Sequence, residues 1–131
     1  MAKKILIIDD SALMRRVISD IIKTNKQYEV ADFARDGLEG FDRIVSHPKM
    51  YDAIILDINM PKMNGLELLE MLQKNHIQET VIVVSTVAKE GAKETIKALE
   101  LGAFDFVTKP ENFIEAKGED FKQRILDMLD I

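Results

Sequence analysis

Acidic side chains and one lysine follow short apolar segments at three places in this sequence. Asp9 and Asp10 end a first apolar run, Asp57 ends a second, and Lys109 follows a third and directly precedes Pro110. Continuous apolar runs of this kind are typical of parallel strands that are buried on both faces. Because ligands bind at the carboxyl ends of such strands, we expect these charges to converge on one site.

Three carboxylates brought together raise one another's pKa unless a cation joins them. Mg²⁺ prefers oxygen ligands and often takes one or two carboxylates together with phosphate oxygens. Asp9, Asp10 and Asp57 therefore predict a Mg²⁺ site, which a backbone carbonyl just past Asp57, near Asn59, could complete. One carboxylate of such a site can attack a phosphoryl group and form an acyl phosphate, while Lys109 contacts a phosphoryl oxygen.

Hydroxyl side chains follow a further apolar run, at Ser85 and Thr86, where either could bond another phosphoryl oxygen. Taken alone, an aspartate at a strand end is more often a helix cap or a solvated turn residue. The acids, the hydroxyl and the lysine at four strand ends form a much more specific pattern than any one of them.

Strand and helix patterns alternate along the whole sequence, which predicts an α/β fold with a parallel sheet covered on both faces. We expect a doubly wound five-stranded parallel sheet of flavodoxin-like (βα)5 type, with strand order 2-1-3-4-5. Residues 1–131 are then one domain, and 111–118 is its least regular stretch. The predicted strands end at about Asp9, Ala34, Asp57, Val84 and Thr108; the predicted helices cover 13–22, 36–46, 66–72, 90–101 and 119–130.

Composition excludes several classes of function. The apolar fraction is 47%, the net charge is −5 and there is no basic run, so we expect no direct nucleic-acid binding. The absence of cysteine excludes disulfides and thiolate chemistry. The start of the chain carries too few apolar residues for a signal peptide or membrane span, so we expect a cytoplasmic protein without membrane contact.

These motifs resemble the receiver domain of two-component response regulators over essentially the whole chain. The resemblance rests on residues 7–11, 56–61 with 64–65, 83–85 and 109–110. It implies that a sensor histidine kinase donates a phosphoryl group from its phosphohistidine to an aspartate in a Mg²⁺-dependent step. It further implies a cis peptide bond before Pro110. In the roles that it implies, Asp57 is the phosphoryl acceptor, and Asp9, Asp10 and Asn59 are metal ligands. Lys109 contacts the phosphate, and Ser85, Thr86 and Phe106 are the switch residues.

Residues 10–16 and 90–103 look like the receiver half of the chemotaxis protein-glutamate methylesterase. The Gly-x-Ser-x-Gly motif of an esterase is absent from these 131 residues. Within them we expect no enzymatic activity beyond self-phosphorylation and dephosphorylation, and an attached esterase domain is left open. In this family phosphorylation switches a surface of the fourth helix, the fifth strand and the last helix, which contacts an output domain or target protein.

Three other functions compete with this one. A degenerate receiver would only bind partners, but the complete acid, hydroxyl and lysine set argues against it. A metal-dependent phosphatase with an aspartyl nucleophile usually shows Asp-x-Asp after its first strand, whereas Asp9 and Asp10 are adjacent. A flavodoxin-type electron carrier would place the flavin phosphate where these two acids would repel it.

Overall fold

Strands and helices alternate along the chain, as the apolar patterns predict. The computed structural model describes residues 1–130; Ile131, the end of the predicted domain, lies outside the described residues. The elements are β1 (Lys3–Ile8), α1 (Ala12–Lys23), β2 (Tyr28–Ala34), α2 (Gly37–Ser46), β3 (Ala53–Leu56), α3 (Gly65–Lys74), β4 (Val81–Ser85), α4 (Lys93–Glu100), β5 (Asp105–Thr108), α5 (Phe113–Ala116) and α6 (Glu119–Leu129).

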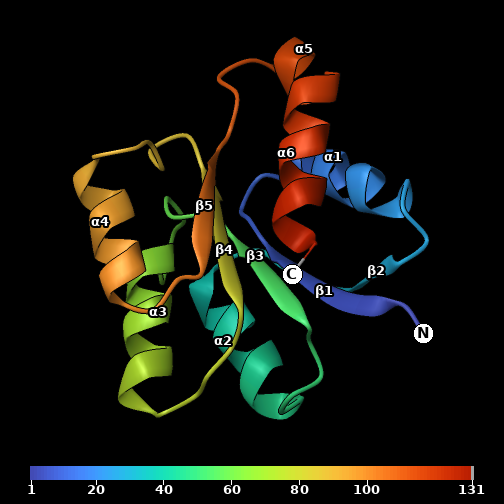
Figure 1. Cartoon of the computed structure of the whole chain (residues 1–131). Helices are drawn as coiled ribbons and strands as arrows, with labels where there is room; N and C mark the ends of the chain where they lie inside the picture. The colour runs from blue at the N-terminus through green and yellow to red at the C-terminus, as the bar shows by residue number, and fades with distance from the viewer. Residues whose placement is uncertain (131) are drawn as a thin grey trace.

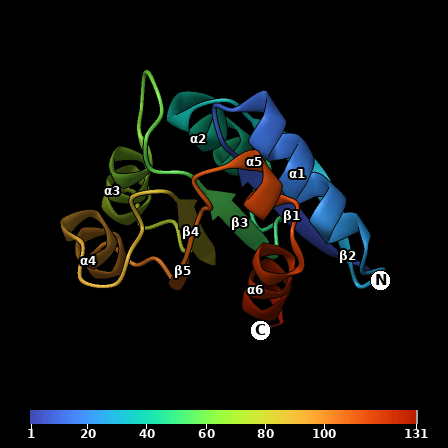
Figure 2. The same cartoon turned by 90° about the horizontal axis from the view of Figure 1, so that it is seen from above.

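The five strands form one parallel sheet in the order β2-β1-β3-β4-β5, which confirms the expected flavodoxin-like arrangement. The register places Ile8 beside Leu56, and Ser85 beside Thr108. Each of these residues is the last of its strand, so the residues that follow all leave the sheet at the same edge. Figure 2 looks onto this edge, with the arrowhead of β3 near its centre.

Each face of the sheet is covered by its own group of helices (Figures 1 and 2). One apolar cluster joins α1 and α6 to strand residues that include Val84 and Val107. The second joins α2, α3 and α4 to residues that include Val83 and Leu56. Because alternate residues of β4 enter opposite clusters, the sheet is buried on both faces, and this burial explains why its central strands are apolar without interruption.

Most helix starts are fixed by a side chain of the preceding residue. Ser11, Asp36, Asn64 and Asn112 each accept a hydrogen bond from the backbone N–H three residues later. At α3 the Glu67 side chain also accepts from the Asn64 N–H, which completes a capping box. No such side-chain bond is present at the starts of α4 and α6, where Ala92 and Gly118 stand at the cap position.

The structure departs most from the predicted elements at two places. Helix α4 begins at Lys93, three residues after the predicted start, because Gly91 has a left-handed backbone with φ of 81° that interrupts a helix. The stretch expected to be irregular contains the short helix α5.

The expected cis bond before Pro110 is wrong, since no peptide bond among the described residues is cis. Across residues 1–130, no helix combines the length and apolar character needed to span a membrane.

Candidate functional site

Asp9 directly follows the carboxyl end of β1, an inner strand of the sheet, and is almost fully buried. Its backbone N–H donates to the Ala34 carbonyl of β2 at 3.1 Å, so the sheet pairing continues one residue past the strand. One side-chain oxygen of Asp9 accepts from the Ser11 N–H at 2.9 Å. The turn into α1 therefore holds this carboxylate above the edge of the sheet.

Asp57 occupies the equivalent position on β3, and its backbone N–H donates to the Ile8 carbonyl at 3.0 Å. Its Oδ1 accepts from the Ile58 N–H at 2.8 Å, and its side chain is buried. The start of α3 packs directly against this backbone: a Cβ on Gly65 would lie 2.3 Å from the Asp57 carbonyl oxygen. The sequence motif containing Gly65 thus has a steric reason, since any side chain there would displace the loop that carries Asp57.

Lys109 reaches both carboxylates from the end of β5. Its Nζ lies 2.8 Å from Oδ2 of Asp9 and 3.3 Å from Oδ2 of Asp57, and all three side chains are buried. Burial by itself lowers the pKa of Lys109, but the two carboxylates outweigh it and the pKa is raised. The ammonium therefore stays charged at neutral pH.

Burial raises the pKa of the Asp9 carboxyl, Lys109 lowers it and the neighbouring Asp57 raises it again, with a net upward shift. Acidic groups also outnumber basic ones at the site, because one ammonium faces the carboxylates of Asp9 and Asp57.

Asp10 supplies the third carboxylate and is exposed to solvent. One oxygen from each of Asp9, Asp10 and Asp57 lies within 4.8 Å of the others, close enough for a single cation to join them. The excess of acidic groups and the all-oxygen donor set fit a hard divalent cation such as Mg²⁺. Asn59, expected to add its backbone carbonyl, is exposed two residues beyond Asp57 in the loop between β3 and α3.

Arg15 is a contact that the sequence did not reveal. From the first turn of α1, its Nη1 donates to the backbone carbonyl of Asp9 at 2.6 Å. The bond has no signature in the sequence, because its acceptor is a backbone carbonyl, which every residue carries. This bond ties α1 to the turn that positions Asp9.

The three expected switch residues take different positions. Ser85 ends β4 with a fully buried side chain whose hydroxyl has no hydrogen-bond partner among residues 1–130. Its carbonyl accepts from the Lys109 N–H at 3.0 Å, which ties the two strand ends together. Thr86 is exposed, and Phe106 is half-buried against the cluster beneath α3 and α4.

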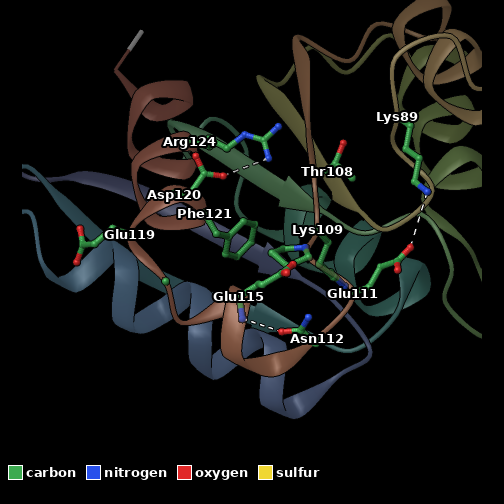
Figure 3. A pocket seen from close by; sticks show the side chains of 12 residues that line it. Lys89, Thr108, Lys109, Glu111, Asn112, Glu115, Glu119, Asp120, Phe121 and Arg124 are labelled. Atoms are coloured by element: carbon green, nitrogen blue, oxygen red, sulfur yellow. Dashed lines mark hydrogen bonds and ion pairs between the residues drawn. The ribbon is translucent and has the colours of Figure 1, made fainter.

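A pocket lies beside the end of β5, between the β4–α4 connection and α6 (Figure 3). Lys89 and Glu111 form an ion pair at 3.8 Å across it, and Arg124 and Asp120 form another on α6 at 3.9 Å. Lys109 also lines this pocket, while its ammonium is bound to the two acids of the site. The backbone around Lys109 therefore connects the acidic site with the α4–β5–α6 side of the molecule.

Comparisons with known proteins agree with this geometry. The family model for the response regulator receiver domain matches residues 5–117. A protein-glutamate methylesterase/protein-glutamine glutaminase of Pyrococcus horikoshii is 42% identical over 123 residues, covering 94% of this chain and 33% of that protein. The chain thus spans about a third of the length of this curated relative.

Two solved structures share the fold over nearly the whole chain. The response regulator domain of Thermotoga maritima CheB gives a TM-score of 0.83 at 36% identity, covering 100% of this chain and 98% of that one. The CheX–CheY–BeF3–Mg complex of Borrelia burgdorferi gives 0.81 at 27% identity, covering 97% and 86%. With the matched family model spanning most of its length, this chain belongs to the response regulator receiver domain family and resembles the CheB branch of it.

Proposed function

We propose that this chain accepts a phosphoryl group on Asp57 from a phosphohistidine of a separate sensor histidine kinase. The observation that carries the proposal is the buried Asp57 carboxylate, held beside Asp9 and Asp10 and contacted by the Lys109 ammonium. Both histidines of this chain, His47 and His76, are exposed and follow helices α2 and α3, away from the acidic edge. Neither histidine of these 131 residues is therefore placed to be the phosphoryl donor.

In the transfer, an Asp57 oxygen forms a bond to phosphorus while the nitrogen–phosphorus bond of the donor breaks, and the imidazole leaves with a proton from solvent. Asp9, Asp10 and Asp57, with the Asn59 carbonyl, would hold Mg²⁺. Bound there, it would neutralise charge on the phosphoryl oxygens. Lys109 is already charged and desolvated beside Asp57, so it can contact a phosphoryl oxygen without a large rearrangement. The unpaired Ser85 hydroxyl is available for another oxygen.

The output would be read on the surface formed by α4, β5 and α6. When Ser85 turns toward the phosphoryl group, the half-buried Phe106 ring can move into the space that it leaves. Exposed apolar side chains support a partner on this surface: Ile96 and Leu99 lie one turn apart on α4, and Phe104 precedes β5. The partner would be an output domain or a target protein.

The similarity to methylesterase receivers supports a role in chemotaxis signalling in the cytoplasm, with residues 1–131 acting as one receiver unit. Helix α6 lies beyond the matched residues 5–117, yet its Phe121, Ile125 and Leu129 are buried in the same cluster as α1 and the sheet. This packing supports including α6 in the unit.

The decisive test is metal-dependent modification of Asp57. The protein is incubated with acetyl phosphate, with and without Mg²⁺, and analysed by intact mass spectrometry. We expect one added phosphoryl group that requires Mg²⁺, is lost in Asp57→Asn and is retained in Asp42→Asn, which changes an exposed aspartate of α2. Modification that persists in Asp57→Asn, or that ignores Mg²⁺, would contradict the proposal.

A further inference from the structure

Two buried side-chain hydroxyls lack a hydrogen-bond partner within residues 1–130, Oγ of Ser85 and Oγ1 of Thr95. Both residues are at most 2% exposed. An unpaired buried hydroxyl costs free energy, so each needs a physical reason. The proposed phosphoryl contact accounts for Ser85, but nothing in that chemistry accounts for Thr95.

The two hydroxyls lie in the same layer of the molecule. Val83 pairs in register with Phe106, and both contact the cluster beneath α3 and α4. Ser85, two residues after Val83, faces the same side of β4. On the other side of this layer, Thr95 is one turn from Ala98, which is buried in the same cluster. Both hydroxyls are therefore enclosed between the β4–β5 edge and α4.

The start of α4 is weakly fixed. Its cap residue is Ala92, which offers no side-chain acceptor, and Thr95 occupies the third helical position. The connection from β4 is held at Ala88, whose carbonyl accepts from the Thr108 hydroxyl at 2.6 Å. Between these points Gly91 has a φ of 81°, and a glycine can change between left-handed and helical backbone at little cost.

A threonine inside a helix commonly donates its hydroxyl to the carbonyl four residues earlier. For Thr95 that residue is Gly91, whose left-handed backbone keeps it outside the helix and leaves the Thr95 hydroxyl unpaired. If Gly91 became helical, α4 would start earlier. The Gly91 carbonyl would then come within reach of the Thr95 hydroxyl. The arrangement seen in the structure thus carries an unfavourable unpaired hydroxyl at Thr95.

We propose that Thr95 is a positioning residue that couples phosphorylation of Asp57 to α4. In the phosphorylated arrangement the β4 end shifts with Ser85, Gly91 becomes helical, and Thr95 donates to the Gly91 carbonyl. This inference rests on the proposed phosphoacceptor function and adds the residue through which α4 responds. Because the hydroxyl is paired in only one arrangement, its free energy favours that arrangement.

The test uses Thr95→Val, which keeps the shape and removes the hydroxyl, and Thr95→Ser, which keeps the hydroxyl. Each variant of the whole chain is titrated with beryllofluoride in the presence of Mg²⁺, and amide chemical shifts are followed by NMR. We expect Thr95→Val to need about tenfold more beryllofluoride, since one net hydrogen bond is lost from the activated arrangement. Thr95→Ser should stay within about twofold of the original chain.

A second measurement separates this role from a structural one. Without ligand, Thr95→Val should unfold at a urea concentration equal to or above that of the original chain, because it removes an unpaired hydroxyl. In the original chain, beryllofluoride should move the Gly91 carbon shifts toward helical values, and Thr95→Val should reduce this change.

The outcomes are distinguishable. If the original chain shows no Mg²⁺-dependent response to beryllofluoride, the proposed function is wrong and this inference falls with it. If the original chain responds and Thr95→Val responds at the same concentration, only the role of Thr95 is wrong. A Thr95→Val protein that is destabilised without ligand would also overturn the inference, because the hydroxyl would then be paired at rest.

Discussion

Replacing Lys109 by methionine should destabilise the metal-free protein strongly. Its ammonium is the only cation with a side-chain contact to Asp9 or Asp57 among the ion pairs of residues 1–130. At 2.8 Å and 3.3 Å, and with an effective dielectric constant of about 20, each contact contributes roughly 5–6 kcal/mol of Coulomb attraction before desolvation is subtracted. Removing one partner of a buried ion pair costs about 3–5 kcal/mol, because the remaining charges stay buried and unpaired.

Excess Mg²⁺ should restore most of that loss, because a divalent cation among the three acids replaces the missing positive charge. The free energy of unfolding is measured by urea denaturation, once with EDTA and once with Mg²⁺. We expect Lys109→Met to gain more from Mg²⁺ than the original chain does. Mg²⁺ without any effect on the variant would refute the metal site.

A matched control is available in Lys89, whose ion pair with Glu111 at 3.8 Å is exposed. Lys89→Met should change the free energy of unfolding by no more than about 0.5–1 kcal/mol. If Lys109→Met cost no more than Lys89→Met in EDTA, the reasoning about buried charge at this site would be refuted.

Three further predictions concern the scaffold. Gly65→Ala should lower the free energy of unfolding by about 1–3 kcal/mol in urea denaturation, because its Cβ would meet the Asp57 carbonyl; an unchanged value would mean that the loop can yield. Phe121→Ala should cost about 3–5 kcal/mol in a single urea transition, whereas the exposed Ile114→Ala should stay within about 0.5 kcal/mol; a separate transition for α6 would argue against one unit. Burial raises the pKa of Glu79, and the nearby positive charge of Lys49 lowers it by a smaller amount. The stability that Glu79 contributes is therefore present below pH 4.5 and is lost as pH rises through the raised pKa. Glu79→Gln should therefore raise the thermal midpoint at pH 7 and change it little near pH 4; equal gains at both values would contradict this sign.

The fold could be predicted because the clearest patterns in the sequence are apolar runs, and strands buried on both faces produce such runs. The central strands β1, β3 and β4 are covered on both faces, so their apolar runs identified a parallel sheet. Parallel order then brought Asp9 and Asp57 to one edge, although they are far apart in the chain. For this reason the position of the acidic site could be predicted from strand ends alone.

The missed features depend on backbone atoms or on very short segments. The bond from Arg15 and the close packing of Gly65 are both made to backbone carbonyls, of Asp9 and of Asp57, and every residue carries a backbone carbonyl. Helix α5 did have a local signal, since Asn112 caps it and Glu115 lies three residues later, but four residues carry too little periodicity for detection. The expected cis bond before Pro110 came from family resemblance, and the structure differs from it.

The two sides of the acidic edge are braced very unequally. On the β3 side, the Met63 carbonyl accepts from the Gly37 N–H at 2.8 Å, the Ile58 carbonyl accepts from Gly65, and a capping box closes the loop. On the β4 side, the helix that follows has no side-chain cap and its leading glycine is left-handed. In the proposed phosphorylation of Asp57, the β4 side should therefore move more readily than the β3 side, which is held by more hydrogen bonds. Substitutions in α4 should then change the proposed output while leaving the proposed phosphoryl transfer to Asp57 intact.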